Sequence, residues 1–112
     1  MNTVALVGRL TRDPVPRGAT PDGPVAVLRL AVPRRNGGDD AVFVNVVCFD
    51  RLASAALEHL AHGRRVAVTG RLEHREWTDD AGARRERHEV VADRLDWLDT
   101  PARVDAGLDS QA

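Results

Sequence analysis

The sequence contains no lysine and no tyrosine, and aromatic side chains make up only 4% of its 112 residues. All 16 basic residues are therefore arginine. Either a GC-rich genome or selection for planar guanidinium groups would produce this bias, and both explanations stay open. Because large aromatic side chains are so few, their positions carry more information than usual: they are Phe43, Phe49, Trp77 and Trp97.

Cysteine and long apolar runs are scarce as well. A single cysteine, Cys48, excludes an internal disulfide and is compatible with a reducing compartment. No apolar run approaches the roughly 20 residues that a membrane-spanning helix needs. The first residues show no basic segment followed by an apolar run, so no signal peptide is expected. We expect a soluble, cytoplasmic protein with no membrane partner.

Positive and negative charges are also nearly balanced, since the formal net charge is only -1. Its distribution is uneven, because residues 1–94 carry 15 arginines against 13 acidic residues and the remainder is acidic. From about residue 100 onward the side chains are small, polar and acidic, which is typical of disorder. We therefore predict one domain over residues 1–99 and a short acidic, disordered tail over residues 100–112.

Alternating apolar positions predict five strands, at residues 3–10, 25–32, 41–49, 64–77 and 84–92, the last continuing briefly to residue 98. Prolines and glycines predict a break and a turn over residues 13–24. Between the third and fourth strands, Asp50 is expected to cap a helix over residues 51–61, which Gly63 ends. This order fits an all-β fold, a five-stranded Greek-key barrel of the OB type with one short helix between strands 3 and 4.

The segment 41–49 is the most informative of the predicted strands. Alternation places an aliphatic face, Val42 to Cys48, toward the core, and puts Phe43 and Phe49 on the other side with Asn45. In the strand 64–77, Leu72 is expected on the core side together with Val66 and Val68. Leu95 and Trp97 are expected to close the core.

Candidate catalytic and metal-binding groups do not form a recognisable site in the sequence. His59 and His62 lie three residues apart near the helix end, but no cysteine or carboxylate cluster completes a metal site around them. His74 and His88 face each other on the predicted hairpin without a nucleophile. Cys48 lies on the core face, where cysteines are usually inert. We predict a non-enzymatic protein with no metal and no other cofactor.

Binding is the better interpretation of the aromatic residues. Phe43, Phe49 and Trp77 each lie on the face opposite their strand's apolar face, and Trp77 shares its side with Arg71 and Arg75. Unpaired bases stack on exposed aromatic rings, and arginine neutralises phosphates, so this combination suits a single-stranded nucleic acid. The alternative is an OB-fold protein-interaction subunit whose exposed aromatics form an interface. RNA also stays open, because stacking does not read the 2′-hydroxyl.

Five segments together resemble the bacterial single-stranded DNA-binding protein family. They are MNTVALVGRLTRDP (1–14), FVNVV (43–47), VTGRL (68–72), WTDDAG (77–82) and EVVAD (89–93). The resemblance implies a homotetrameric OB-fold protein that binds and protects single-stranded DNA during replication, recombination and repair. It also implies base stacking on Phe43, Phe49 and Trp77, and basic contacts from Arg51 and Arg75.

The sequence departs from the family pattern in three places. After the second predicted strand, where the family often has another aromatic, it has Arg34 and Arg35, whose guanidinium planes can also stack on bases. Glu73 and Glu76 occupy positions that are often basic. The chain ends Leu-Asp-Ser-Gln-Ala. In the family, a long linker is commonly followed by an acidic tip that ends in apolar residues and recruits repair and replication enzymes, and this sequence shows neither. We therefore expect either a tail-less or short-tailed member or a shortened chain, and recruitment of these enzymes stays in doubt.

Overall fold

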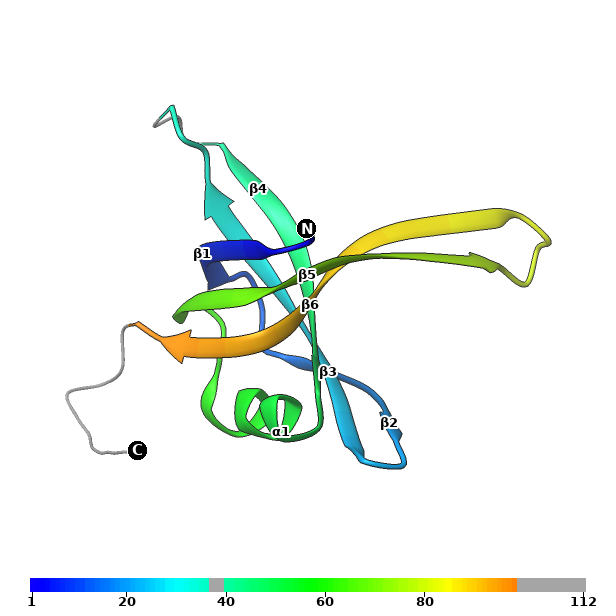
Figure 1. The fold of residues 1–112 in the computed structure, drawn as a ribbon, viewed down its shortest axis with the longest axis horizontal. Helices are drawn as coiled ribbons and strands as arrows, with labels where there is room; N and C mark the ends of the chain where they lie inside the picture. The colour runs from blue at the N-terminus through cyan, green and yellow to red at the C-terminus, as the bar shows by residue number, and fades with distance from the viewer. Residues whose placement is uncertain (37–39, 99–112) are drawn as a thin grey trace.

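Six strands and one helix form the part of the chain that the computed structural model describes, residues 1–36 and 40–98. The elements are β1 (Val4–Leu10), β2 (Val15–Thr20), β3 (Gly23–Pro33), β4 (Ala41–Phe49), α1 (Asp50–His59), β5 (Arg65–Thr78) and β6 (Arg84–Trp97). Figure 1 shows α1 beneath one end of the sheet and the β5–β6 hairpin projecting far to one side. None of the helices described is long and apolar enough to cross a membrane.

Five of the strands close into a ring. The order β1-β5-β6-β4-β3 returns to its start because β1 also pairs with β3, at Arg9 opposite Ala31 and Leu10 opposite Leu30. The β4–β6 contact is parallel and the other contacts are antiparallel. A closed five-stranded ring with a helix after its third strand is the OB arrangement, so the predicted fold is confirmed.

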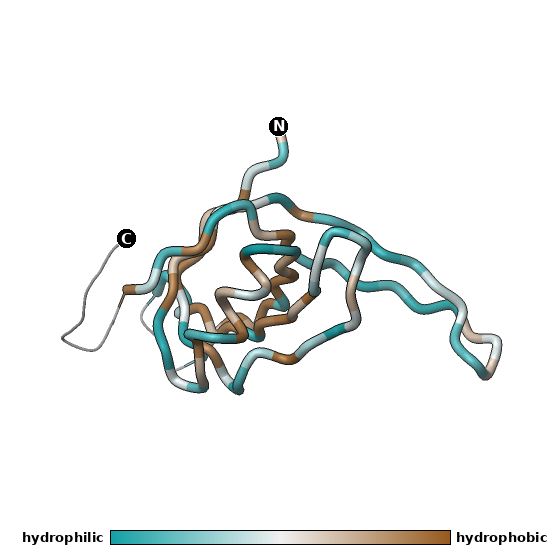
Figure 2. The backbone as a smooth tube through the Cα atoms, turned by 90° about the horizontal axis from the view of Figure 1, so that it is seen from below, coloured by the Kyte–Doolittle hydropathy of each residue, from teal (hydrophilic) through white to brown (hydrophobic). Residues whose placement is uncertain are grey.

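The core lies inside this ring and follows the predicted alternation at most positions, but Val42, expected on the core face, is 43% exposed, and Val47, on the opposite face of β4, is buried. Leu28, Leu30, Val46 and Val66 are fully buried, as is the helix face that carries Ala53 and Ala56. Leu95 joins the core, and Trp97 packs against it from the edge. Figure 2 shows apolar positions concentrated in the ring and mainly polar positions along the projecting hairpin.

The strand β2 corrects the sequence-based expectation of a break and turn over residues 13–24. It adds to the outer edge of β3, with Val15 opposite Val27 and Thr20 opposite Gly23, and its register shifts between Pro16 and Ala19. Proline lacks a backbone donor and glycine weakens a strand, but both are tolerated at a sheet edge and at a bulge. This segment is extended because it pairs with β3, whereas its own residues favoured a turn.

The start of α1 also differs from the expectation. Phe49 holds the cap position, and no side chain caps the helix. Asp50 is instead the first helical residue, with a left-handed φ of 54°, which aspartate tolerates better than most residues. The prediction that Asp50 caps the helix is therefore wrong. The helix ends at His59, two residues before the predicted end at residue 61. This sharp turn directs the chain from β4 into α1 immediately after Phe49.

Gly70 marks the point where β5 leaves the barrel. A Cβ atom at this residue would lie 2.0 Å from the carbonyl oxygen of Val91, and the β5–β6 register shifts between Thr69 and Gly70. Beyond it Leu72 is 47% exposed, so the prediction that it faces the core is wrong. The strand continues there as one side of a two-stranded arm with no core beneath it.

The tip of this arm is the turn that the sequence predicted. Asp79 Oδ1 accepts hydrogen bonds from the backbone N–H groups of Ala81 and Ala83, at 3.0 and 2.9 Å. Arg85 donates to the other carboxylate oxygen at 2.8 Å. The Arg85 hydrogen bond, and then the bond from Ala83, hold the pKa of Asp79 below its usual value.

Candidate nucleic-acid interface

The three aromatics predicted to bind a ligand are exposed on one side of the sheet. Alternation along β4 turns Phe43 and Phe49 away from the buried Val46 and Cys48. Phe43 is 54% exposed, Phe49 is 38% exposed, and Trp77 on the arm is 37% exposed. Rings of this size are usually buried, so three partly exposed rings on β4 and β5, which are separated by β6, form an unusual surface for a ligand.

Guanidinium groups lie over two of these rings. The Cζ atom of Arg29 lies 4.8 Å from the centre of the Phe43 ring. Arg75 and Arg87 approach Trp77 from the paired strands of the arm, at 5.8 and 5.4 Å from the ring centre. Cations at such distances are attracted to the negative face of an aromatic ring. The rings are therefore held beside positive charge.

Two adjoining hollows run along the same side of the sheet. One, of about 650 Å³, is bordered by Phe49, Arg71 and Arg75. The other, of about 320 Å³, is bordered by Arg12, Arg29, Asn45 and Arg87. Arg17 borders both hollows, so we treat them as one feature, the arginine groove. Its borders come from β2, β3, β4 and the arm. These strands follow one another in the sheet, and their arrangement can be followed in Figure 1.

Glu89 lies at the floor of the arginine groove and is only 2% exposed. Arg17 reaches it across β3 and β4, with Nη1 at 2.9 Å from Oε2. Arg75 and Arg87 lie at 3.9 and 3.5 Å from its carboxylate oxygens. Burial alone would raise the pKa of Glu89, but the hydrogen bond and charge of Arg17 and the charges of the other two arginines outweigh it, so the pKa is lowered. One carboxylate thus anchors three of the groove's guanidiniums.

Acidic neighbours and an unpaired amide also shape the groove. Arg71 Nε donates to Glu73 at 2.7 Å, and its Nη1 lies 3.4 Å from Asp93. These ion pairs are exposed, and pairs of this kind are worth little, so an anionic ligand could exchange with them at small cost. Asn45 Oδ1 is buried without a hydrogen-bond partner among the described residues, and it faces the groove.

The remaining predicted arginines lie outside the groove. Arg34 and Arg35 follow the end of β3 and border a separate shallow hollow with Pro33 and Val42. They lie beyond the end of the strand pair that carries Phe43. Arg51 is exposed in the first turn of α1, two residues after Phe49. Their role in binding stays a prediction.

Sequence reasoning missed several groove residues. Arg29 and Arg87 could have been found by alternation, because Arg29 lies opposite the parity of Leu28 and Leu30, and Arg87 shares the parity of Glu89. Arg17 lies in the segment expected to be a turn, and its contact with Glu89 spans 72 residues, so no local signal indicated it.

Cys48 and the helical histidines contribute no reactive site among the residues described. Burial raises the pKa of Cys48 to about 12, so its thiol stays protonated and unreactive at neutral pH. His59 and His62 are exposed, and His59 pairs with Glu58 at 3.4 Å. His74 and His88 do face each other on the arm, as predicted.

Comparison with known proteins identifies a protein family that matches this chain. The profile of the single-strand binding protein family matches residues 1–98. The chain belongs to this family. It is 39% identical over 104 residues to a single-stranded DNA-binding protein of Thermotoga maritima, covering 88% of this chain and 74% of that one. It is 38% identical over 111 residues to one of Caldanaerobacter subterraneus, covering 96% and 74%, and 34% identical over 116 residues to one of Wolinella succinogenes, covering 98% and 72%.

Membership of the single-strand binding protein family confirms the resemblance seen in the sequence. The match includes β1 to β6, and therefore the arginine groove and all three exposed rings. The acidic tail predicted over residues 100–112 lies outside both the match and the described residues. Its disorder and its lack of a recruiting tip stay predictions.

Proposed function

We propose that this protein binds single-stranded DNA with little sequence preference and without catalysis, by stacking bases on Phe43, Phe49 and Trp77. The observation that carries the proposal is that these rings are exposed on the same side of the sheet as the arginine groove. Relatives that carry the name single-stranded DNA-binding protein support the choice of ligand.

Stacking explains why the ligand would be single-stranded. Each base stacked on an aromatic ring contributes roughly 1–3 kcal/mol, and every base has a flat face, so sequence matters little. A duplex hides those faces within its own stack.

Arginines would neutralise the phosphates between the stacked bases. In this proposal Arg71 and Arg75 bind the backbone along the groove, while Arg34, Arg35 and Arg51 continue the path beyond Phe43 and Phe49. The groove arginines Arg12, Arg17, Arg29 and Arg87 join them. The salt dependence of affinity should then have a log–log slope of roughly -0.7 for each phosphate contact.

Truncation of the rings tests the stacking claim. Trp77→Ala and Phe49→Ala should each weaken oligo-dT binding by roughly 1–3 kcal/mol, about 5- to 150-fold, while the domain stays folded. The measurement is fluorescence anisotropy of labelled oligo-dT, with circular dichroism as the check on folding. Leu98→Ala is the matched control, because Leu98 is as exposed as the rings but does not border the groove. Equal affinity in all three folded variants would refute stacking.

Fluorescence separates this proposal from the alternative of a protein-interaction subunit. In a Trp97→Phe background the signal comes from Trp77 alone, and stacked bases should quench it on addition of oligo-dT. If the rings formed a protein interface instead, oligo-dT would leave the emission unchanged. Parallel titrations with oligo-U and with duplex DNA decide between DNA, RNA and double strands.

We also propose that the protein is a homotetramer that protects single-stranded DNA in the nucleoid during replication, recombination and repair. Exposed apolar side chains away from the groove, Val7 on β1 and Leu72 on the arm, would serve as subunit contacts. Light scattering should then give about four times the chain mass of 12.2 kDa.

A further inference from the structure

The side of the β5–β6 arm opposite Trp77 carries a cluster of potential metal ligands. Because side chains alternate along a strand, His74 and Glu76 of β5 lie on the other side from Arg75 and Trp77. In the antiparallel register His74 lies opposite His88, and Glu76 lies opposite Glu86. Two imidazoles and two carboxylates therefore form a square of neighbouring side chains.

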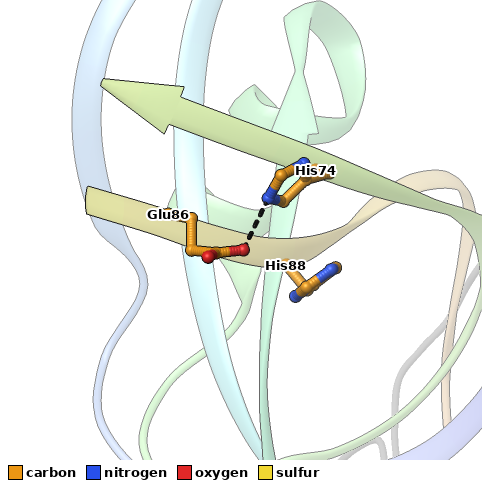
Figure 3. A group of neighbouring side chains, drawn as sticks. All are labelled: His74, Glu86 and His88. Carbon is orange, nitrogen blue, oxygen red and sulfur yellow. Dashed lines mark hydrogen bonds and ion pairs between the residues drawn. The ribbon is translucent and has the colours of Figure 1, made fainter. Parts of the chain in front are cut away.

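The distances within this square are short. The rings of His74 and His88 stack, with their centres 4.7 Å apart. His74 Nε2 lies 2.9 Å from Glu86 Oε1. The dashed line in Figure 3 marks this interaction. One nitrogen of each histidine and one oxygen of Glu86 all lie within 4.8 Å of one another. Glu76 lies slightly farther out, with Oε2 at 3.9 Å from His74, and its other oxygen is held by Arg84 at 2.7 Å.

These atoms are close to the arrangement that a small divalent ion requires. Zinc binds nitrogen and carboxylate oxygen at about 2.0–2.2 Å, so tetrahedral ligand atoms lie roughly 3.4 Å apart. All three side chains are exposed, so the small rotation that closes the remaining gap is not opposed by packing. A bound cation would also offset the repulsion between Glu76 and Glu86, since like charges directly across two strands destabilise a sheet.

We propose that His74, Glu86 and His88 form a surface site for one borderline divalent transition-metal ion, with Zn²⁺ the fitting example. Two imidazole nitrogens favour Zn²⁺, Ni²⁺ or Cu²⁺ over Mg²⁺ and Ca²⁺, which prefer oxygen ligands. Three protein ligands leave a further position for water. The sequence indicated the facing histidines but not the carboxylate beside them, so this proposal goes beyond the expectation of a metal-free protein.

Such an ion would link β5 to β6 outside the barrel. A two-stranded hairpin is at best marginally stable in water, and this arm has no core beneath it. A metal bridge between the strands would fix the arm from the side that faces away from Trp77. It would leave the Trp77 side of the arm free for a ligand, and only His74 of the three metal ligands also borders the arginine groove.

Titration calorimetry on the untagged full-length chain with Zn²⁺ tests the site. We expect one Zn²⁺ per chain, no competition from Mg²⁺, and a rise in melting temperature with Zn²⁺. His88→Gln and Glu86→Gln should each weaken Zn²⁺ binding about tenfold or more, because losing even a residue that only supports a metal ligand costs about 10- to 100-fold. His88 is the better histidine to change, since His74 also borders the arginine groove.

His62→Gln is the matched control, because it removes an exposed histidine far from the arm and should leave Zn²⁺ binding unchanged. Circular dichroism checks that each variant is folded. Using two ligand variants ensures that one misfolded protein does not decide the result. Absence of saturable binding, half an ion per chain, or Zn²⁺ binding retained in both folded ligand variants would overturn the proposal. None of these results bears on DNA binding, so this test is independent of the proposed function.

Discussion

Glu89 places a negative charge at the floor of a groove that is otherwise basic. Its carboxylate holds Arg17 by a 2.9 Å hydrogen bond and attracts Arg75 and Arg87. Long arginine side chains lose conformational entropy when a ligand fixes them. A carboxylate that fixes them beforehand reduces this cost, although it also competes with phosphate for their charge. We interpret Glu89 as a residue that positions the groove arginines.

The substitution Glu89→Gln should reduce the free energy of unfolding by about 1.5–3 kcal/mol at neutral pH, the range for hydrogen bonds to charged groups. The pKa of Glu89 in the folded protein lies below its ordinary value. The carboxylate therefore stabilises the fold above that ordinary value, and its contribution is lost as the pH falls through the lowered pKa. Urea unfolding between pH 3 and pH 7 measures the difference.

Asp80→Asn provides the comparison, because Asp80 is exposed in the turn of the arm. It should change stability by less than about 0.5 kcal/mol at any pH in this range. A constant gap between Glu89→Gln and the natural chain down to pH 3 would show that the loss comes from packing and not from the charged carboxylate.

At this scale the sequence predicted the exposed rings but only part of their surroundings. Phe43, Phe49 and Trp77 followed from alternation, which depends only on the local strand. The role of Arg17 depends on which strands lie between β2 and β6, and that is a property of the closed sheet. Ion pairs across strands leave no local trace in a sequence.

Among the elements, β2 shows why local signals fail. Its sequence, Val-Pro-Arg-Gly-Ala-Thr, has turn-forming residues, yet it is extended because β3 offers a free edge. In their barrel parts, the five ring strands, by contrast, have apolar positions every second residue, and they were predicted within a few residues of their bounds. Those strands are extended because one of their faces is buried, whereas β2 is extended only because it pairs with β3.

Gly70 divides β5 into a barrel part and an arm part, and its substitution tests that division. Gly70→Ala should lower the free energy of unfolding by about 3 kcal/mol, the upper end of overpacking costs, because the new methyl group would meet the Val91 carbonyl. Thermal and urea unfolding measure the change.

Gly18→Ala separates this clash from ordinary glycine strain. Gly18 has a φ of 75° and nothing within 4 Å of an added Cβ, so only the left-handed conformation is penalised. We expect a loss of about 1–2 kcal/mol there. Equal losses at the two glycines would contradict the close approach of β5 and β6 at Gly70.

For the whole molecule, the net charge of -1 conceals a local excess of positive charge. The groove is bordered by arginines from β2, β3, β5 and β6, which outnumber its two acidic residues, Glu73 and Glu89. Affinity for a polyanion depends on the local field and not on the total charge. The near-neutral composition therefore does not oppose the proposed function.

Glu73→Gln should strengthen oligo-dT binding at low salt, because it removes the shorter of the two ion pairs of Arg71, at 2.7 Å, and leaves only the 3.4 Å pair with Asp93. If Arg71 then contacts one more phosphate, the salt slope should steepen by roughly 0.7. Anisotropy titrations over a series of salt concentrations give both values.

Glu58→Gln makes the same change of net charge on α1, away from the groove, and should leave the salt slope unaltered. If both variants shifted affinity equally, the total charge would be responsible and the local account of the groove would fail.

The continuity of β5 and β6 from ring into arm has a consequence for how the arm can vary in length. Inserting two residues into each strand would move the tip outward by about 7 Å and keep tryptophan and histidines on their present sides. Inserting one residue into each would exchange the sides, turning imidazoles toward the groove and the indole away from it. Variation in reach that preserves binding is thus restricted to even steps.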